Sequence, residues 1–188
     1  MDADQQLMAR VRDGDREAFE ALYLRFGSPV MRFLYRLCGD RVLAEDLTQD
    51  VFLKVWRAAA GWRPLGKVGT WLFQIAKHHW WNEAAKRRRR AAIQGSPWTA
   101  QAAADARDER ATPPTERVTR VEWARAVEAA LAALSPKLRL VFVLVRLEGV
   151  SYAETAEIAG IPVGTVKSRA AAAEAALRKR LRREDPSP

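Results

Sequence analysis

The sequence predicts an all-α protein of two small helical domains joined by a flexible linker, with a helix-turn-helix in the C-terminal domain. Good helix formers such as Ala, Leu, Glu and Arg dominate the 188 residues, and alternating runs of β-branched residues are missing. Helical periodicity fails over residues 91–117, where Gly and Pro interrupt a weakly charged, Ala-rich stretch. We therefore expect a first domain over residues 1–90, a linker over 91–117 and a second domain over 118–188.

The first domain is expected to contain several helices and one long loop. An amphipathic run covers residues 16–25, and Ser28-Pro29 then suits the start of a second helix, which Gly39 ends. A third helix carries one apolar stripe at a spacing of four, made of Leu43, Leu47, Val51 and Val55. Three glycines and a proline predict a loop over residues 61–69. Residues 70–90 then predict a long helix that ends in a run of basic residues.

The second domain is predicted to end in a helix-turn-helix. Helical periodicity first runs over residues 118–134, restarts at Ser135-Pro136 and stops at Gly149. A short helix over residues 151–159, which begins with the S-x-x-E spacing of a capping box, then precedes a turn and a last helix over 163–183.

The last helix has two distinct faces. At about 100° per residue, its apolar face, which must be buried, contains Val166, Ala170, Ala173, Leu177 and Leu181. The first turns of the opposite face suit contacts with base edges or phosphates in a major groove. The contacts expected there are made by Lys167, Ser168 and, on the flank, Arg169.

The charge distribution indicates an anionic partner. The net charge is +9 and the isoelectric point is near 10.3, which favours nucleic acid, with a membrane surface as the alternative. Basic residues concentrate at residues 86–90 and 178–183. Two separated basic patches predict two contacts on one polyanion, although two solvated helix ends would have the same composition.

Composition argues against several other classes. The single cysteine, Cys38, excludes an intrachain disulfide and suits a reducing cytoplasm. We expect no membrane insertion, because no apolar run approaches the length of a span and the acidic N-terminus lacks the features of a signal peptide. His78 and His79 diverge around a helix without a third ligand nearby, so we expect no metal or other cofactor. The sequence contains no carboxylate cluster, phosphate-binding glycine loop or nucleophile dyad, so we do not expect an enzyme.

Several motifs occur in a characteristic order along the chain. They lie at residues 13–19, 44–57 (AEDLTQDVFLKVWR), 70–76 (TWLFQIA), 134–139, 149–154 and 160–169 (GIPVGTVKSR). The first three resemble region 2, and the last three region 4, of extracytoplasmic-function (group 4) sigma factors of the sigma-70 family. The resemblance implies a cytoplasmic RNA polymerase sigma factor that binds core polymerase and directs promoter recognition, DNA melting and transcription initiation. It also implies contacts with the β′ clamp helices, the β flap, promoter DNA and an anti-sigma factor.

The resemblance also assigns roles to residues. The polar face of the third helix would bind the β′ clamp helices through Asp46, Gln49, Asp50 and Lys54. The −10 element would be bound and melted by Lys67, Lys77, His78, Trp80, Trp81, Lys86, Arg87 and Arg88. Aromatic rings beside cations suit single-stranded DNA, although each of the two tryptophans could equally belong to the core. The −35 element would be read by Thr165, Lys167, Ser168, Arg169, Arg178 and Lys179.

The length of the linker and the composition of the last helix lead to two further expectations. A stretched linker reaches at most about 90 Å, so we expect the domains to lie close together in the free protein and to separate on the polymerase. Residues 170–174 lack the basic cluster usual in the family, and Glu174 is expected on the flank of the DNA-facing surface, where it would repel phosphates.

A stand-alone helix-turn-helix regulator is the alternative function. Such a protein would dimerise and sense a ligand through its N-terminal half. It would not need the motif at residues 44–57, which is the feature that separates the two hypotheses.

Overall fold

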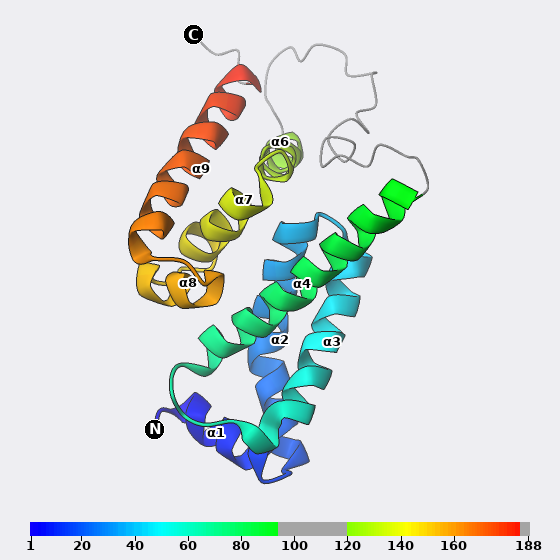
Figure 1. The fold of residues 1–188 in the computed structure, drawn as a ribbon, viewed down its shortest axis with the longest axis vertical. Coiled ribbons are helices and arrows are strands. Elements are labelled where there is room, and N and C mark those ends of the chain that lie inside the picture. The colour runs from blue at the N-terminus through cyan, green and yellow to red at the C-terminus, as the bar shows by residue number, and fades with distance from the viewer. Residues whose placement is uncertain (94–119, 185–188) are drawn as a thin grey trace.

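The computed structural model describes residues 1–93 and 120–184, and this part of the chain is helical without strands. Its N-terminal half contains α1 (Ala3–Arg12), α2 (Arg16–Cys38), α3 (Arg41–Ala58), a 3-10 turn η1 (Ala59–Gly61) and α4 (Val68–Ile93). Its C-terminal half contains α6 (Arg120–Ala132), α7 (Pro136–Phe142), a π-helical turn η2 (Val143–Leu147), α8 (Tyr152–Ala159) and α9 (Val163–Glu184). The all-α class and the helix-turn-helix of α8 and α9 are thus confirmed (Figure 1).

Side chains cap most of the helix starts where the sequence offers Asp or Ser. Asp15 and Asp40 accept the backbone N–H groups of Ala18 and Leu43, which satisfies one of the free donors at the start of α2 and of α3. The capping box predicted for the start of α8 is present. Helix α1, which begins with a second capping box on Asp2, was not among the predicted elements.

One predicted boundary is wrong, because α2 is a single helix with Pro29 inside it. A proline within a helix removes one hydrogen bond and costs about 3 kcal/mol. Buried side chains lie on both sides of it, including Leu22, Val30 and Phe33, and each stabilises the packed helix by about 1.5–3 kcal/mol. Tertiary packing therefore outweighs the local tendency to break.

The two halves share one hydrophobic core. Leu140, Val143, Leu144 and Ile158 of the C-terminal half belong to the same cluster as the side chains of α2 and α4. In Figure 1 the helices of the C-terminal half lie alongside α2 and α4, with α8 beside the first turns of α4. The expectation that the halves lie together is met in this structure. The predicted linker starts within the last turn of α4, and its residues 94–117 lie outside the described part of the chain.

Buried threonines offer a matched pair of stability tests. Thr155 is fully buried in the helix-turn-helix, and its hydroxyl has no hydrogen-bond partner among the described residues. We expect Thr155→Val to raise the free energy of unfolding by about 1 kcal/mol, since the buried hydroxyl is removed without a change of shape. Thr48 is the control, because its buried Oγ1 donates to the carbonyl of Ala44 at 2.6 Å. Thr48→Val should lower the free energy of unfolding by about 1 kcal/mol in the same denaturant titration. If the two substitutions changed this free energy equally, the hydroxyl of Thr155 would not be the unsatisfied one of the pair.

Candidate nucleic-acid interface

The middle of α4 holds the aromatic pair that the sequence placed at the −10 element. The indole of Trp81 is 38% exposed, whereas that of Trp80 is only 5% exposed and belongs to the core. The two rings meet edge to face, with centroids 5.4 Å apart. Trp80 therefore has no free face on which a base could stack in this structure. The sequence left open which of the two tryptophans is exposed. In the structure only Trp81 is available for stacking on a base, and the buried ring of Trp80 packs against it.

The basic residues of α4 differ in their exposure, and therefore in whether they are free to contact DNA. Lys86 and Arg88 are exposed, but Arg87 is half-buried and forms ion pairs with Asp40 and Glu83. Lys77 is also half-buried, and this desolvation lowers its pKa.

His78, by contrast, is exposed on the same helix, with its Nδ1 lying 2.8 Å from the carbonyl oxygen of Gln74. The imidazole is therefore oriented by its own helix.

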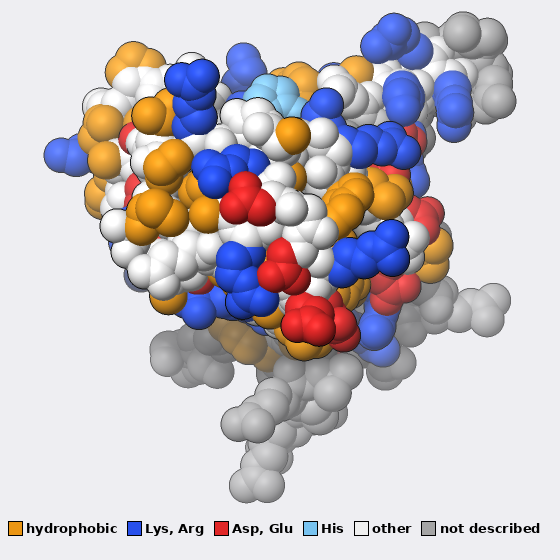
Figure 2. Space-filling view, turned by 90° about the horizontal axis from the view of Figure 1, so that it is seen from below, with side chains coloured by type: hydrophobic (Ala, Val, Ile, Leu, Met, Phe, Trp, Pro, Cys, Tyr) orange, Lys and Arg blue, Asp and Glu red, His pale blue; other side chains and the backbone are white. Residues whose placement is uncertain are grey.

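Figure 2 shows the molecule from the end at which α1 lies. Basic and acidic side chains are interspersed on that face.

The loop between η1 and α4 borders an open pocket of about 530 Å³. Trp62, the first residue of the loop, is buried and Leu65 is almost fully exposed. The carbonyl of Gly66 accepts a hydrogen bond from Nε2 of Gln5 at 3.1 Å. The pocket is lined by residues of the loop and of α4, by Ala58 and Gly61 before the loop, and by Glu157 of α8. Loop and helix-turn-helix thus meet at one site.

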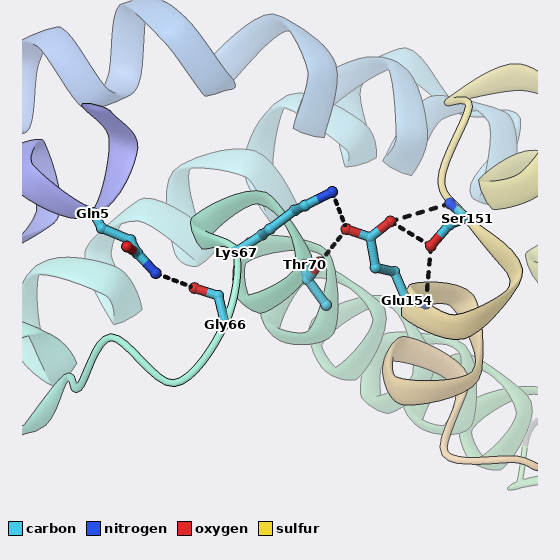
Figure 3. A network of polar contacts seen from close by, with 6 residues as sticks. All are labelled: Gln5, Gly66, Lys67, Thr70, Ser151 and Glu154. Carbon is cyan, nitrogen blue, oxygen red and sulfur yellow. Dashed lines mark hydrogen bonds and ion pairs between the residues drawn. The ribbon is translucent and has the colours of Figure 1, made fainter. Parts of the chain in front are cut away.

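Lys67 and Glu154 connect the two halves at this site (Figure 3). The Nζ atom of Lys67 lies 2.9 Å from Oε1 of Glu154, and the hydroxyl of Thr70 donates to the same oxygen at 3.5 Å. The hydrogen bond to Glu154 raises the pKa of Lys67. Donors from Ser151 first, and then from Lys67, lower the pKa of Glu154. A lysine expected on the −10 element is therefore bound by a carboxylate from the other half of the chain.

The orientation predicted for α9 agrees with its burial. Val166, Ala170, Ala173 and Leu177 are buried, whereas Leu181, which was also predicted to be buried, is only half-buried. The residues that are exposed on the opposite side are Lys167, Ser168, Ala171, Ala172, Ala175, Arg178 and Lys179. Thr165 and Arg169 are half-buried, and the carbonyl of Thr165 accepts the hydroxyl of Ser168 at 3.1 Å.

Glu174 has a role that the sequence did not indicate. Its Oε1 lies 2.5 Å from Nε of Arg146, and this pairing raises the pKa of Arg146. The carboxylate is partly neutralised within its own domain, so its repulsion of phosphates is weaker than the sequence predicts.

The third helix presents a polar ridge beside an apolar patch. The apolar stripe of this helix predicted that its polar face is exposed. The structure agrees for Asp46, Gln49, Asp50 and Lys54. The neighbouring aromatic cluster was not predicted, and in it Phe19 contacts Phe52 and Trp56 edge to face and Tyr23 contacts Phe52. Leu53 and Trp56 are 52% and 37% exposed. The sequence did contain a signal for this exposed patch, because Leu53 and Trp56 are apolar but fall outside the buried stripe of the helix.

Comparisons with known proteins decide between the two functions. Residues 22–90 match the family described as Sigma-70 region 2, and residues 124–177 match Sigma-70, region 4. The RNA polymerase sigma-H factor of Pseudomonas aeruginosa is 32% identical over 182 residues, which cover 95% of this chain and 93% of that protein. The ECF RNA polymerase sigma factor SigM of Mycobacterium tuberculosis is 34% identical over 179 residues, or 95% and 85% of the two chains. The chain is an extracytoplasmic-function sigma factor of the sigma-70 family.

Solved structures agree with this assignment. The structure of CnrH in complex with the cytosolic domain of CnrY has a TM-score of 0.73 and 25% identity, covering 98% of this sigma factor and all of that chain. The sigma factor RpoE of Bartonella quintana, in complex with the anti-sigma factor NepR, has a TM-score of 0.68 and 25% identity, covering 87% and 96%. The sigma factor therefore shares its fold with both, and the hypothesis of a stand-alone regulator is not needed.

Two negative observations complete the description of the sigma factor. None of its described helices is long and apolar enough to cross a membrane. Within residues 1–93 and 120–184, no three His, Cys, Asp or Glu side chains gather in a way that could hold a metal ion. Sigma-70 factors are not a family of enzymes.

Proposed function

We propose that this sigma factor acts in the cytoplasm by binding core RNA polymerase through α3 and promoter DNA through α4 and α9. It is a binding subunit that has no catalytic activity and needs no cofactor. Its functional units are residues 1–90, a linker over 91–117 and residues 118–188. The observation that carries the proposal is that the polar ridge of α3 and the DNA-facing side of α9 are both exposed while their apolar faces are buried.

The contact with the β′ clamp helices is assigned to the ridge of α3. Asp46, Gln49, Asp50 and Lys54 supply charges and an amide that are soluble when free and pair with a partner when bound. Leu53 and Trp56, which border the ridge, supply the apolar surface that an interface core needs.

The β flap is assigned to a groove in the C-terminal half. A cavity of about 430 Å³ lies between α6, the end of α7 and α9, and its apolar lining includes Trp123, Val127, Phe142 and Leu177. Trp123 is 46% exposed there, and an exposed indole over an apolar groove is typical of a protein-binding site.

Promoter DNA is assigned to two surfaces. Trp81, Lys67 and the basic end of α4 suit an unpaired strand, because a ring stacks on a base while cations neutralise phosphates. Lys167, Ser168 and Arg178 suit the major groove of the −35 element. The similarity to RpoE, which was solved in complex with the anti-sigma factor NepR, supports an anti-sigma factor as a further partner.

Binding to core polymerase can be tested at the ridge. We expect Asp46→Lys combined with Gln49→Ala to weaken the affinity for core polymerase at least about tenfold, because one charge is reversed and one amide is lost at an interface. Both residues are exposed, so circular dichroism should show an unchanged fold. Glu17→Lys with Gln6→Ala makes the same chemical change at exposed positions of α2 and α1 and should leave the affinity unchanged. Equal affinities of the two double variants would contradict the assignment.

A further inference from the structure

We propose that Arg146 of η2, held in place by Glu174 of α9, is an additional phosphate contact of the helix-turn-helix on promoter DNA. This inference rests on the proposed function, because it assumes that α9 lies in the major groove of the −35 element. It adds a DNA-binding residue from outside the recognition helix. It also gives Glu174 a role in binding DNA rather than in repelling it.

Helix α9 contains a long stretch without a basic residue. Between Arg169 and Arg178 the sequence has only alanines, Glu174 and Leu177. At a rise of about 1.5 Å per residue, about 13.5 Å of the helix therefore carries no Lys or Arg side chain. Neutralisation of phosphates supplies much of the affinity of DNA-binding proteins. A cation from another element is needed if this part of α9 is to follow the DNA backbone.

Glu174 lies in this stretch, on the same side of α9 as two exposed cations. It follows Lys167 by seven residues, so it is rotated by only about 20° around the helix and lies about 10.5 Å further along the axis. Arg178 comes about 6 Å later, with a rotation of about 40°. Lys167 and Arg178 are both exposed. The three side chains therefore form one row along the flank of α9, with a carboxylate in the middle.

Arg146 reaches the middle of this row from a different element. Its Nε atom lies 2.5 Å from Oε1 of Glu174, and the two side chains are 46% and 32% exposed. The neighbouring residues Val143 and Leu144 of η2 are fully buried. The backbone that carries Arg146 is therefore fixed by the core, and its guanidinium group lies where α9 itself has no cation.

The contact with Glu174 is compatible with a second contact to a phosphate. The hydrogen bond uses Nε, which is one of the five N–H donors of the guanidinium group. Arginine binds phosphate through two parallel N–H groups, and the Nη atoms can supply them. Glu174 holds the side chain in one orientation, so less rotamer entropy is lost when DNA binds. Its carboxylate therefore acts as a positioning group for Arg146.

The surroundings of Arg146 place it at the DNA backbone. Glu174 first, and then Tyr152, raise the pKa of Arg146, so the guanidinium lies near the first residue of α8 as well as near α9. In a helix-turn-helix the first helix crosses the DNA backbone while the second lies in the major groove. Figure 1 shows α8 packed against the beginning of α9. A cation between these two helices is positioned for a phosphate rather than for a base edge.

The stability of the fold does not account for this ion pair. Pairs that are partly exposed to water contribute little, because both charges stay solvated. The core beside Glu174 depends instead on apolar contacts of Leu131, Ala173 and Leu177. We therefore expect Arg146→Met and Arg125→Met, which changes an exposed arginine of α6, to unfold at nearly the same temperature when followed by circular dichroism.

The first experiment measures the phosphate contact in the holoenzyme. The probe is a fluorescein-labelled promoter that the wild-type holoenzyme has selected from random-sequence DNA. We expect Arg146→Met to weaken binding about three- to tenfold and to reduce the slope of log affinity against log salt by about one unit, since one phosphate contact is lost. Arg146→Lys keeps the charge without the paired donors and should fall between. Arg125→Met should bind as the wild type does.

The second experiment uses the sign of the effect of Glu174→Gln. If Glu174 positions Arg146, this substitution should weaken promoter binding about two- to threefold although it removes a negative charge near DNA. In the Arg146→Met background it should no longer weaken binding, because only the repulsion of phosphates is left to remove. Glu157→Gln removes an exposed carboxylate of α8 and should not weaken binding. Tighter binding by the single variant Glu174→Gln would overturn the proposal.

A reference variant separates failure of this inference from failure of the proposed function. Lys167→Met removes a cation that the proposed function already assigns to DNA. Core polymerase is kept in excess, because Glu174 also borders the groove assigned to the β flap. If Lys167→Met weakens binding and Arg146→Met does not, the inference is wrong and the proposed function stands. If neither variant changes the affinity or the salt slope, α9 does not bind the promoter, and the proposed −35 contact fails together with the role of Arg146.

Discussion

Replacement of Arg139 by methionine is expected to lower the free energy of unfolding by about 2–4 kcal/mol and to loosen the contact between the two halves. Nη1 of Arg139 donates to the carbonyl of Leu37 at 2.7 Å, and Nη2 donates to the carbonyls of Ala132 and Leu134. These oxygens lie at or just beyond the C-terminal ends of α2 and α6, where carbonyls lack partners within the helix. Burial lowers the pKa of Arg139, and its substitution would leave several carbonyls unsatisfied.

The effect of Arg139 can be measured by denaturation in guanidinium chloride and by small-angle scattering. The free energy of unfolding should fall and the radius of gyration should rise, because Leu37 belongs to the N-terminal half and Arg139 to the C-terminal half. Lys137→Met is the matched control, since Lys137 is exposed on the same helix. An equally small change in both variants would show that the carbonyls find water or other donors instead.

Alanine in place of Trp81 is expected to reduce the amount of open promoter complex about 5- to 150-fold, which corresponds to the loss of one stacked base worth about 1–3 kcal/mol. Its indole is the exposed member of the pair with Trp80, and the basic end of α4 follows in sequence. Permanganate reactivity of unpaired thymines in the holoenzyme complex reports the effect. The loss should be larger on duplex promoter than on a pre-melted template.

Two controls separate stacking from a change in fold. Trp81→Phe keeps an aromatic face and should restore most of the reactivity. Trp80→Ala removes a core side chain, so it should lower stability by about 3–5 kcal/mol and reduce binding through misfolding. If Trp81→Ala impaired duplex and pre-melted templates equally, a role in melting would be excluded.

Local rules of sequence were sufficient for much of this molecule. Capping side chains mark the starts of α2, α3 and α8, and glycines in the left-handed conformation mark the ends of α2 and α8, because a cap depends on neighbours within a few residues. Angular position along α9 was enough to assign its buried and exposed faces. The family motifs were enough for the sigma-factor function, because they extend over both halves of the chain.

Other features depended on contacts between residues that are far apart in the chain. Pro29 stays inside a helix because buried side chains on both sides of it pack against the core, and no local rule includes that stabilisation. Trp80 and Trp81 are adjacent and chemically identical, so only the elements packed around α4 distinguish the buried ring from the exposed one.

The same reason applies to Lys67 and Glu154, which are 87 positions apart and carry no pattern that predicts their pairing. Each residue alone has the properties that its motif indicates: a basic loop residue suited to phosphate and an acidic residue in a capping box. Their contact exists because apolar surfaces of α4 and α8 pack together, and such packing is cooperative and non-directional. Sequence patterns therefore established what each half is, whereas burial across the two halves established which of their charged groups meet.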